Sequence, residues 1–342
     1  MPVVLPAHYR FAHAYAIFLH DLIVGQLRSG IEARVFNTSI PLSEQEAKSF
    51  TGLQGEELYR WLEENVPPEV LVETDYKMLV QALIADFCHY VLEALNASRK
   101  GKLTVAFTLL RKPFQDSLFY LEWILADLPD FLDRFRNRGA KEVEVKGLPV
   151  ERRKEIIREA VTALTESHTI DPGFIYDVRY NRAEHYSLAG LSDKAVHLVT
   201  TNAHLLTAPQ NFNFIFSSPD EFESQWHHLY LVVPQLLFHA ERVVSQIMSR
   251  VAKWDSGWDI WMEVRREIGL LLYMDSVIGS DRERVDAARE ALRRMVAALA
   301  PGCPQCGKEF QFHLRNMRQL CVRGALHCPR CRDTVVFEVG PD

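Results

Sequence analysis

The chain lacks the features that mark several common classes of protein. Its 342 residues contain no apolar run that approaches the length of a membrane span, and the nearest, residues 229–238, is short and holds a proline. The N-terminus has neither the basic segment nor the small-residue cleavage site of a secretory signal. The net charge is −6, so there is no overall excess of cations. These absences predict a cytoplasmic protein that does not enter a membrane.

The short motifs of well-known enzymes are absent as well. There is no G-x-G-x-x-G, no phosphate-binding P-loop, no G-x-S-x-G and no H-E-x-x-H. A di-iron helical bundle needs two Glu-x-x-His pairs, yet the only acid found three residues before a histidine is Asp86, before His89. The usual nucleotide cradles, the hydrolase nucleophile and the di-iron centre are therefore not expected.

Cysteine is scarce but concentrated, since five of the six cysteines lie between residues 303 and 331. Two Cys-x-x-Cys pairs stand there, and two intervening residues let both sulfurs of a pair bind one ion. Four thiolates form the tetrahedral shell that suits Zn²⁺, with iron as the main alternative metal and redox disulfides as the alternative without metal. We expect one structural zinc per chain, because protein ligands fill every position. The predicted ligands are Cys303, Cys306, Cys328 and Cys331.

The spacing around the pairs predicts a small β unit. A gap of 21 residues separates them, and residues 310–316, 319–327 and 334–339 have the composition of strands. Gly307 follows the first pair, where a left-handed backbone turns amides toward sulfur, whereas Arg332 follows the second. "CPQCG" resembles a rubredoxin-type knuckle, and residues 302–342 resemble a zinc ribbon. The resemblance implies a unit that depends on its metal to fold.

The predicted ribbon is locally basic. Between residues 303 and 332, six lysines and arginines stand against Glu309 alone. We expect Arg315, Arg318 and Arg323 to bind nucleic-acid phosphates, and the neighbouring Phe310 and Phe312 to stack on bases. A solvated face that balances the charge of the acidic body is an equal alternative for this surface. The ribbon is otherwise expected to dock on a partner protein, or to be a purely structural zinc staple.

The first 300 residues show helical periodicity almost throughout. The predicted fold class is therefore mainly α, with a multi-helix body (residues 1–300) and a small C-terminal β zinc ribbon (302–342). A charged linker near 136–149 and an irregular insertion near 180–218, which includes the β-like "FNFIF", interrupt the body. Long helices are expected over 74–101, 102–127, 150–168 and 218–254.

Polar residues occur within the otherwise apolar segment 102–127, where Pro113 predicts a kink. Buried polar groups must find partners, so we expect a buried network that fixes the register of this helix. The residues concerned are Arg111, Gln115, Asp116 and Glu122.

One motif in the body points to catalysis. "RYNRAEH" places Arg179 six residues before His185. It is similar to the Arg-x(4–6)-His signature of HEPN domains, an all-helical nucleotide-binding and ribonuclease family, although Tyr180 stands where that family usually has a polar residue. The resemblance implies metal-independent cleavage of RNA at the cleft of a homodimer. In that case Arg179 would hold phosphate and His185 would transfer protons.

Overall fold

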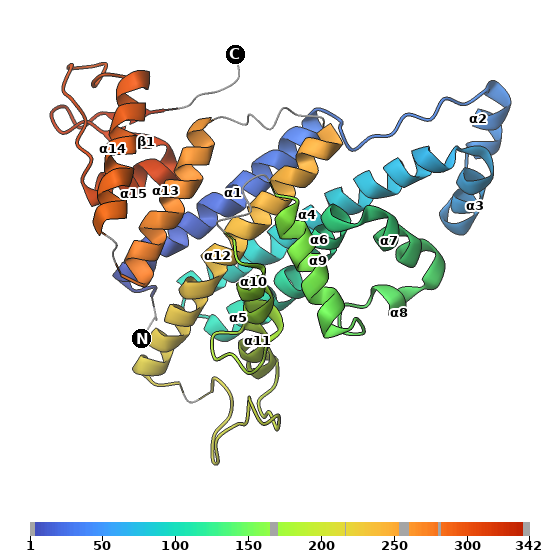
Figure 1. Cartoon of the computed structure of the whole chain (residues 1–342), viewed down its shortest axis with the longest axis horizontal. Coiled ribbons are helices and arrows are strands. Elements are labelled where there is room, and N and C mark those ends of the chain that lie inside the picture. The colour runs from blue at the N-terminus through green and yellow to red at the C-terminus, as the bar shows by residue number, and fades with distance from the viewer. Residues whose placement is uncertain (1–3, 165–169, 216, 253–259, 280–281, 338–342) are drawn as a thin grey trace.

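The computed structural model describes residues 4–164, 170–215, 217–252, 260–279 and 282–337 (Figure 1). The fold is mainly α, as predicted, with one short two-stranded sheet near the C-terminus. The elements are η1 (Ala7–Tyr9), α1 (Arg10–Glu32), α2 (Glu44–Phe50), α3 (Gly55–Asn65), α4 (Pro68–Arg99), α5 (Leu103–Lys112), η2 (Pro113–Ser117), α6 (Leu118–Ala126), α7 (Leu128–Asp133), η3 (Arg134–Arg138), α8 (Ala140–Val143), α9 (Val150–Thr162), α10 (Pro172–Tyr180), α11 (Leu188–Val196), α12 (Pro219–Ala252), α13 (Ile260–Val277), α14 (Arg282–Leu299), α15 (Leu314–Arg323), β1 (Ala325–His327) and β2 (Thr334–Val336).

Three long helices form the centre of the body. α1 packs against both α12 and α4, and α5 packs on the other side of α4 (Figure 1). Their facing sides are apolar at helical spacing, so packing removes fully buried residues such as Leu19, Ile84 and Val233 from water. α12 begins at a capping box, because Ser218 and Glu221 exchange hydrogen bonds between side chain and backbone.

The predicted helices 74–101, 102–127, 150–168 and 218–254 correspond to α4, the α5–η2–α6 segment, α9 and α12. Residues 165–168 and 253–254 of these predictions lie outside the described residues. The expected kink at Pro113 takes the form of η2, a π-helical turn. Proline has no N–H to continue the α-helical ladder, so the chain passes through one wider turn before α6 begins.

One prediction about hydropathy needs correction. Among the described residues one helix, α4, is long and apolar enough to cross a membrane by length and composition, whereas no such run was expected. The helix lies in the main core, where Val80, Phe87 and Val91 are fully buried. Length and apolar composition alone do not distinguish a membrane span from a long helix that packs in a protein core, and α4 has the second kind of environment.

The two irregular segments of the body are more ordered than predicted. The charged linker 136–149 contains the end of η3 and all of α8, and its Val145 and Leu148 are buried in the main core. The insertion 180–218 contains α11, followed by a loop in which Thr200, Thr207 and Asn213 hydrogen-bond with one another. The described part of "FNFIF" contains no strand.

A second, smaller core lies at the C-terminal end. Trp261, Leu272 and Leu292 come from α13 and α14, while Met317 and Leu320 come from α15. The predicted boundary at residues 300–302 therefore runs through one shared core. The expected three-stranded ribbon is wrong, because residues 314–323 form a helix. Only 325–327 and 334–336 pair, as an antiparallel ladder.

Candidate metal centre

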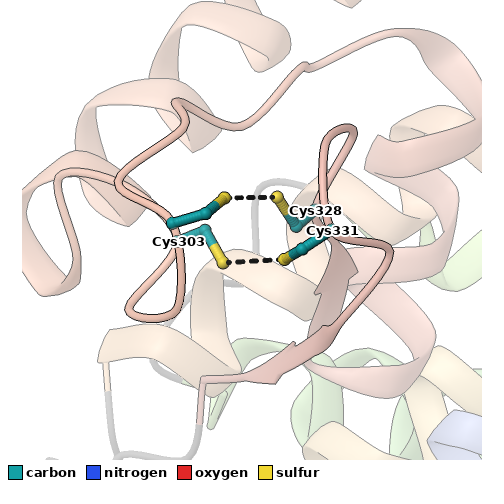
Figure 2. Close-up of side chains that lie close together, drawn as sticks. Cys303, Cys328 and Cys331 are labelled. Carbon is teal, nitrogen blue, oxygen red and sulfur yellow. Dashed lines mark hydrogen bonds between the residues drawn. The ribbon is translucent and has the colours of Figure 1, made fainter.

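The four cysteines of the two Cys-x-x-Cys pairs converge on one point. All four Sγ atoms lie within 4.8 Å of one another. Cys303 Sγ is 3.6 Å from Cys331 Sγ, and Cys306 Sγ is 3.5 Å from Cys328 Sγ (Figure 2). A tetrahedron of thiolates about 2.3 Å from a central ion has edges of roughly 3.8 Å. The donor set and its dimensions therefore fit a single tetrahedral metal ion.

The first pair sits in a tight backbone knuckle. The N–H of Cys303 donates to the carbonyl of Lys308 at 2.9 Å, and the N–H of Gly307 donates to the carbonyl of Cys303 at 2.8 Å. Gly307 has φ +70°, a left-handed conformation that glycine adopts without a steric penalty. This is the conformation expected from "CPQCG".

The second knuckle repeats the first despite its different sequence. The N–H of Cys328 donates to the carbonyl of Asp333 at 2.8 Å, and the N–H of Arg332 donates to the carbonyl of Cys328 at 3.1 Å. Arg332 has φ +61°, so an arginine takes the left-handed position that glycine holds in the first knuckle. Figure 2 shows the two knuckles facing each other with their sulfurs directed into the space between them.

Electrostatics also favour a cation at this point. Although burial opposes ionisation of Cys328, the backbone N–H groups of Cys331 and Arg330 and the adjacent thiols lower its pKa to about 6. The pKa of Cys331 is lowered by the N–H of Asp333, but desolvation and the neighbouring thiols raise it to about 12. Four thiolates this close repel one another, so full ionisation needs a positive ion among them.

We call residues 303–337, which include both knuckles, α15 and the two strands, the metal unit. This unit packs on the body through α15. Arg265 of α13 donates from Nε to the carbonyl of Cys321 at 3.0 Å, and its guanidinium lies 4.7 Å from the ring centre of Phe18 in α1. Trp261 of α13 donates to the carbonyl of Phe337 at 2.8 Å, just beyond β2. No short spacing pattern signals these contacts, because they join residues more than 50 positions apart.

Cys321 was predicted to be a packed thiol rather than a ligand. It is fully buried in the second core, where burial raises the pKa of its thiol to about 12. It lies on α15 rather than on a strand. The spacing of Leu314, Met317 and Cys321, followed by Gly324, is the helical signal that predicts this element.

The three arginines predicted to bind phosphate have different surroundings. Arg315 and Arg323 are exposed. Arg318 is half-buried, and its guanidinium contacts Asp275 at 3.3 Å and lies 5.1 Å from the ring centre of Phe11. Arg318 therefore links α15 to α13 and α1, and its guanidinium already has protein partners there.

Five exposed cations lie in the same C-terminal segment as the four cysteines, and we call this set the basic rim. Among the residues that the structure describes, none of its members forms an ion pair. In the described part of the same segment, residues 303–337, the exposed acids are Glu309 and Asp333. The basic rim consists of Lys308, Arg315, Arg323, Arg330 and Arg332.

The phenylalanines expected to stack on bases pack inward instead. The rings of Phe310 and Phe337 are 5.6 Å apart in an edge-to-face arrangement, and Phe312 packs against the second core. The basic rim therefore carries positive charge, but Phe310 and Phe312 are not free beside it to stack on bases.

Comparison of the chain with protein-family models, with curated proteins and with solved structures gives no match. The resemblance to HEPN domains thus rests on the short motif and the helical class alone.

Arg179, predicted to hold phosphate, is fully buried and bonded inside the protein. Its Nη1 lies 2.6 and 2.7 Å from the two carboxylate oxygens of Glu122, and its Nε donates to the carbonyl of Phe114 at 2.7 Å. His239 completes the network with Nε2 at 2.6 Å from Glu122. Burial opposes ionisation of Glu122, yet the guanidinium of Arg179 and the imidazole of His239 hold its pKa below the usual range.

Part of the buried polar cluster expected around Pro113 is confirmed by this network. Glu122 is a member and Gln115 contributes its carbonyl, which accepts a hydrogen bond from Tyr180 at 2.7 Å. The wider π-helical turn leaves carbonyls without helical partners, and Arg179 and Tyr180 supply donors to two of them. Arg111 instead pairs with Asp193 at 3.3 Å.

His185, predicted to transfer protons, lies in a different environment from Arg179. Its ring is exposed and lies 5.9 Å from the ring of His228 and 5.1 Å from that of Tyr186. The motif that suggested catalysis therefore has one member in the core and one at the surface. No described contact joins the two.

Proposed function

We propose that this protein is a zinc-stabilised helical protein that binds the phosphate backbone of nucleic acids through the basic rim of its metal unit. The observation that carries the proposal is a set of five exposed cations, without ion-pair partners among the described residues, in the same segment as four converged cysteines. The charge is concentrated there even though the chain as a whole carries −6.

Zinc is the metal that the ligand chemistry favours. Four thiolates suit Zn²⁺ and iron, and a site closed by four protein ligands is structural because no position remains for substrate. The metal would join both knuckles and so hold α15 against α13, since α15 lies in the chain between them. A structural role for the metal and a binding role for the rim are compatible.

The zinc proposal is tested by elemental analysis of protein purified without added metal. We expect close to one zinc per chain, and loss of that zinc when Cys306 and Cys331 are both replaced by serine. Absence of metal, or iron with visible thiolate absorption, would refute the zinc assignment.

Binding through the basic rim should depend on charge and not on base sequence. Each phosphate contact on a single strand contributes about −0.7 to the salt slope, so five contacts predict roughly a hundredfold loss of affinity between 50 and 200 mM salt. The packed Phe310 and Phe312 leave few rings for stacking, so oligonucleotides of different sequence should bind alike.

The deciding measurement is fluorescence anisotropy with short single-stranded RNA and DNA. Replacing Arg315 and Arg323 by glutamine should reduce the salt slope by about 1.4 and leave the zinc content unchanged. A matched control replaces Arg293 and Arg294, which are exposed but paired with Glu290, and should change the slope little. Equal effects of the two variants, or no binding at low salt, would refute the proposed nucleic-acid role.

A further inference from the structure

The helices α2 and α3 form a short hairpin at the end of the molecule opposite the metal unit (Figure 1). We call residues 44–65 the acidic arm. None of the residues in its two helices is buried. The arm is held together by the edge-to-face contact of Phe50 with Trp61, 5.1 Å between ring centres, and by a hydrogen bond from Trp61 to Ser49.

The two helices of the arm are short for helices that have no buried residue. They have 7 and 11 residues, shorter than the roughly 12–15 residues that isolated helices need to be even marginally stable in water. Packing against another surface normally supplies the missing stability. Tyr59 of α3 is 48% exposed, so an aromatic side chain is available for such a contact.

The charge of the arm indicates what kind of surface it fits. Six glutamates stand against Lys48 and Arg60 in residues 44–65. Glu63 and Glu64 lie in the last turn of α3, which has no basic residue. Carboxylates at the C-terminal end of a helix are unfavourable because the helix dipole is negative there, and nearby cations relieve this. The arm is thus complementary to a basic surface.

We infer that the acidic arm of one copy docks on the basic rim of a second copy. The arm and the rim lie at opposite ends of the long axis of the chain (Figure 1), so two chains placed side by side and antiparallel bring both contacts together. Such an arrangement has two-fold symmetry and closes as a dimer. Contact between two arms is disfavoured, because it would bring like charges together.

The inference uses the same cations as the proposed function but does not require nucleic-acid binding. If both are correct, the arm competes with nucleic acid for the rim. The test is therefore made without nucleic acid, so that its failure and the failure of the proposed function can be told apart.

The experiment measures the mass of the zinc-loaded full chain by analytical ultracentrifugation at low and high salt. We expect a dimer whose dissociation constant rises at least about tenfold with added salt, and by a similar factor when Glu56, Glu63 and Glu64 are changed to glutamine. The matched control changes three exposed glutamates of α9, Glu151, Glu155 and Glu159, and should leave the dissociation constant unchanged.

Charge reversal provides the stricter test. One variant carries Glu56→Lys, Glu63→Lys and Glu64→Lys, and another carries Arg315→Glu, Arg323→Glu and Arg330→Glu. Each should be monomeric alone, while an equimolar mixture should form a heterodimer because both contacts are restored. Zinc content and the far-ultraviolet circular dichroism spectrum confirm that the variants fold.

Four results of these experiments decide between the proposed dimer and its alternatives. A wild-type chain that stays monomeric at low salt overturns the inference, as does a dimer that is indifferent to the arm and rim variants. A mixture of the reversed variants that remains monomeric overturns it as well. Longer salt-sensitive oligomers that are lost in both variants support the arm–rim contact but refute the closed two-fold arrangement.

Discussion

Replacing Arg179 by methionine should destabilise the protein strongly. The side chain is fully buried and joins α10 to Glu122 of α6 and to the carbonyl of Phe114 in the π-helical turn. Methionine fills much of the same volume but removes the charge. Glu122 would then remain buried with His239 as its remaining side-chain hydrogen-bond partner.

The magnitude follows from the cost of a buried charge without its partner. Removing one member of a buried ion pair typically costs about 3–5 kcal/mol, and we expect about 4 kcal/mol for Arg179→Met. Glu122→Gln leaves the guanidinium facing a neutral amide and should cost about 2–4 kcal/mol. The double variant removes both charges, so its loss should be smaller than the sum of the two single losses by about 2 kcal/mol or more.

The assay is equilibrium unfolding in urea, followed by the helical signal in circular dichroism. Arg182→Gln serves as the control, because Arg182 lies just beyond the same helix, is largely exposed and pairs with Asp193, so we expect a loss below about 0.5 kcal/mol. The reasoning is refuted if Arg179→Met stays within about 1 kcal/mol of wild type, or if the two single losses add without coupling. A phosphate-binding arginine would show the first of these results.

Two further predictions concern pH and metal. Burial and the charge of Arg99 lower the pKa of His13 from 6.5 to about 4, so the fold favours the neutral imidazole. Its stabilising contribution is complete above pH 6.5 and is lost as pH falls toward 4. His13→Gln should therefore lose about 2 kcal/mol less than wild type between pH 6.5 and 5, and equal losses in the two proteins would refute the assignment. Chelation should lower the melting temperature of the second core and change the fluorescence of Trp261, identified by difference from Trp261→Phe. An unchanged Trp261 signal would show that the knuckles fold apart from α13.

The four-cysteine cluster and the helical body were predictable because their signals are local. Cys-x-x-Cys spacing sets which sulfurs share an ion, and periodic apolar residues define α4, α9 and α12. The identity of the metal and the binding partner stay predictions, since converged thiols do not by themselves select them. The strand assignment for residues 310–316 and 319–327 failed because β-type residues outweighed the spacing of Leu314, Met317 and Cys321.

The role of Arg179 could not be read from the sequence for a different reason. Its partner Glu122 lies 57 positions away and His239 lies 60 positions in the other direction, so no short window contains the network. An arginine followed by a histidine in a polar stretch has the composition of a site at the surface. In the folded chain, tertiary packing buries Arg179 and leaves His185 exposed. The same holds for Arg318, whose partners Asp275 and Phe11 come from distant helices.

The shared second core has a consequence for how the protein is made. Synthesis proceeds from the N-terminus, so α1, α4 and α12 leave the ribosome before α15 and the second knuckle exist. The main core can close at that stage, whereas the apolar sides of α13 and α14, including Leu272 and Leu292, stay exposed until the last segments are made. In the proposed zinc-bound form they also require the ion. Supply of metal, rather than folding of the body, would then govern how many newly made chains escape aggregation or degradation.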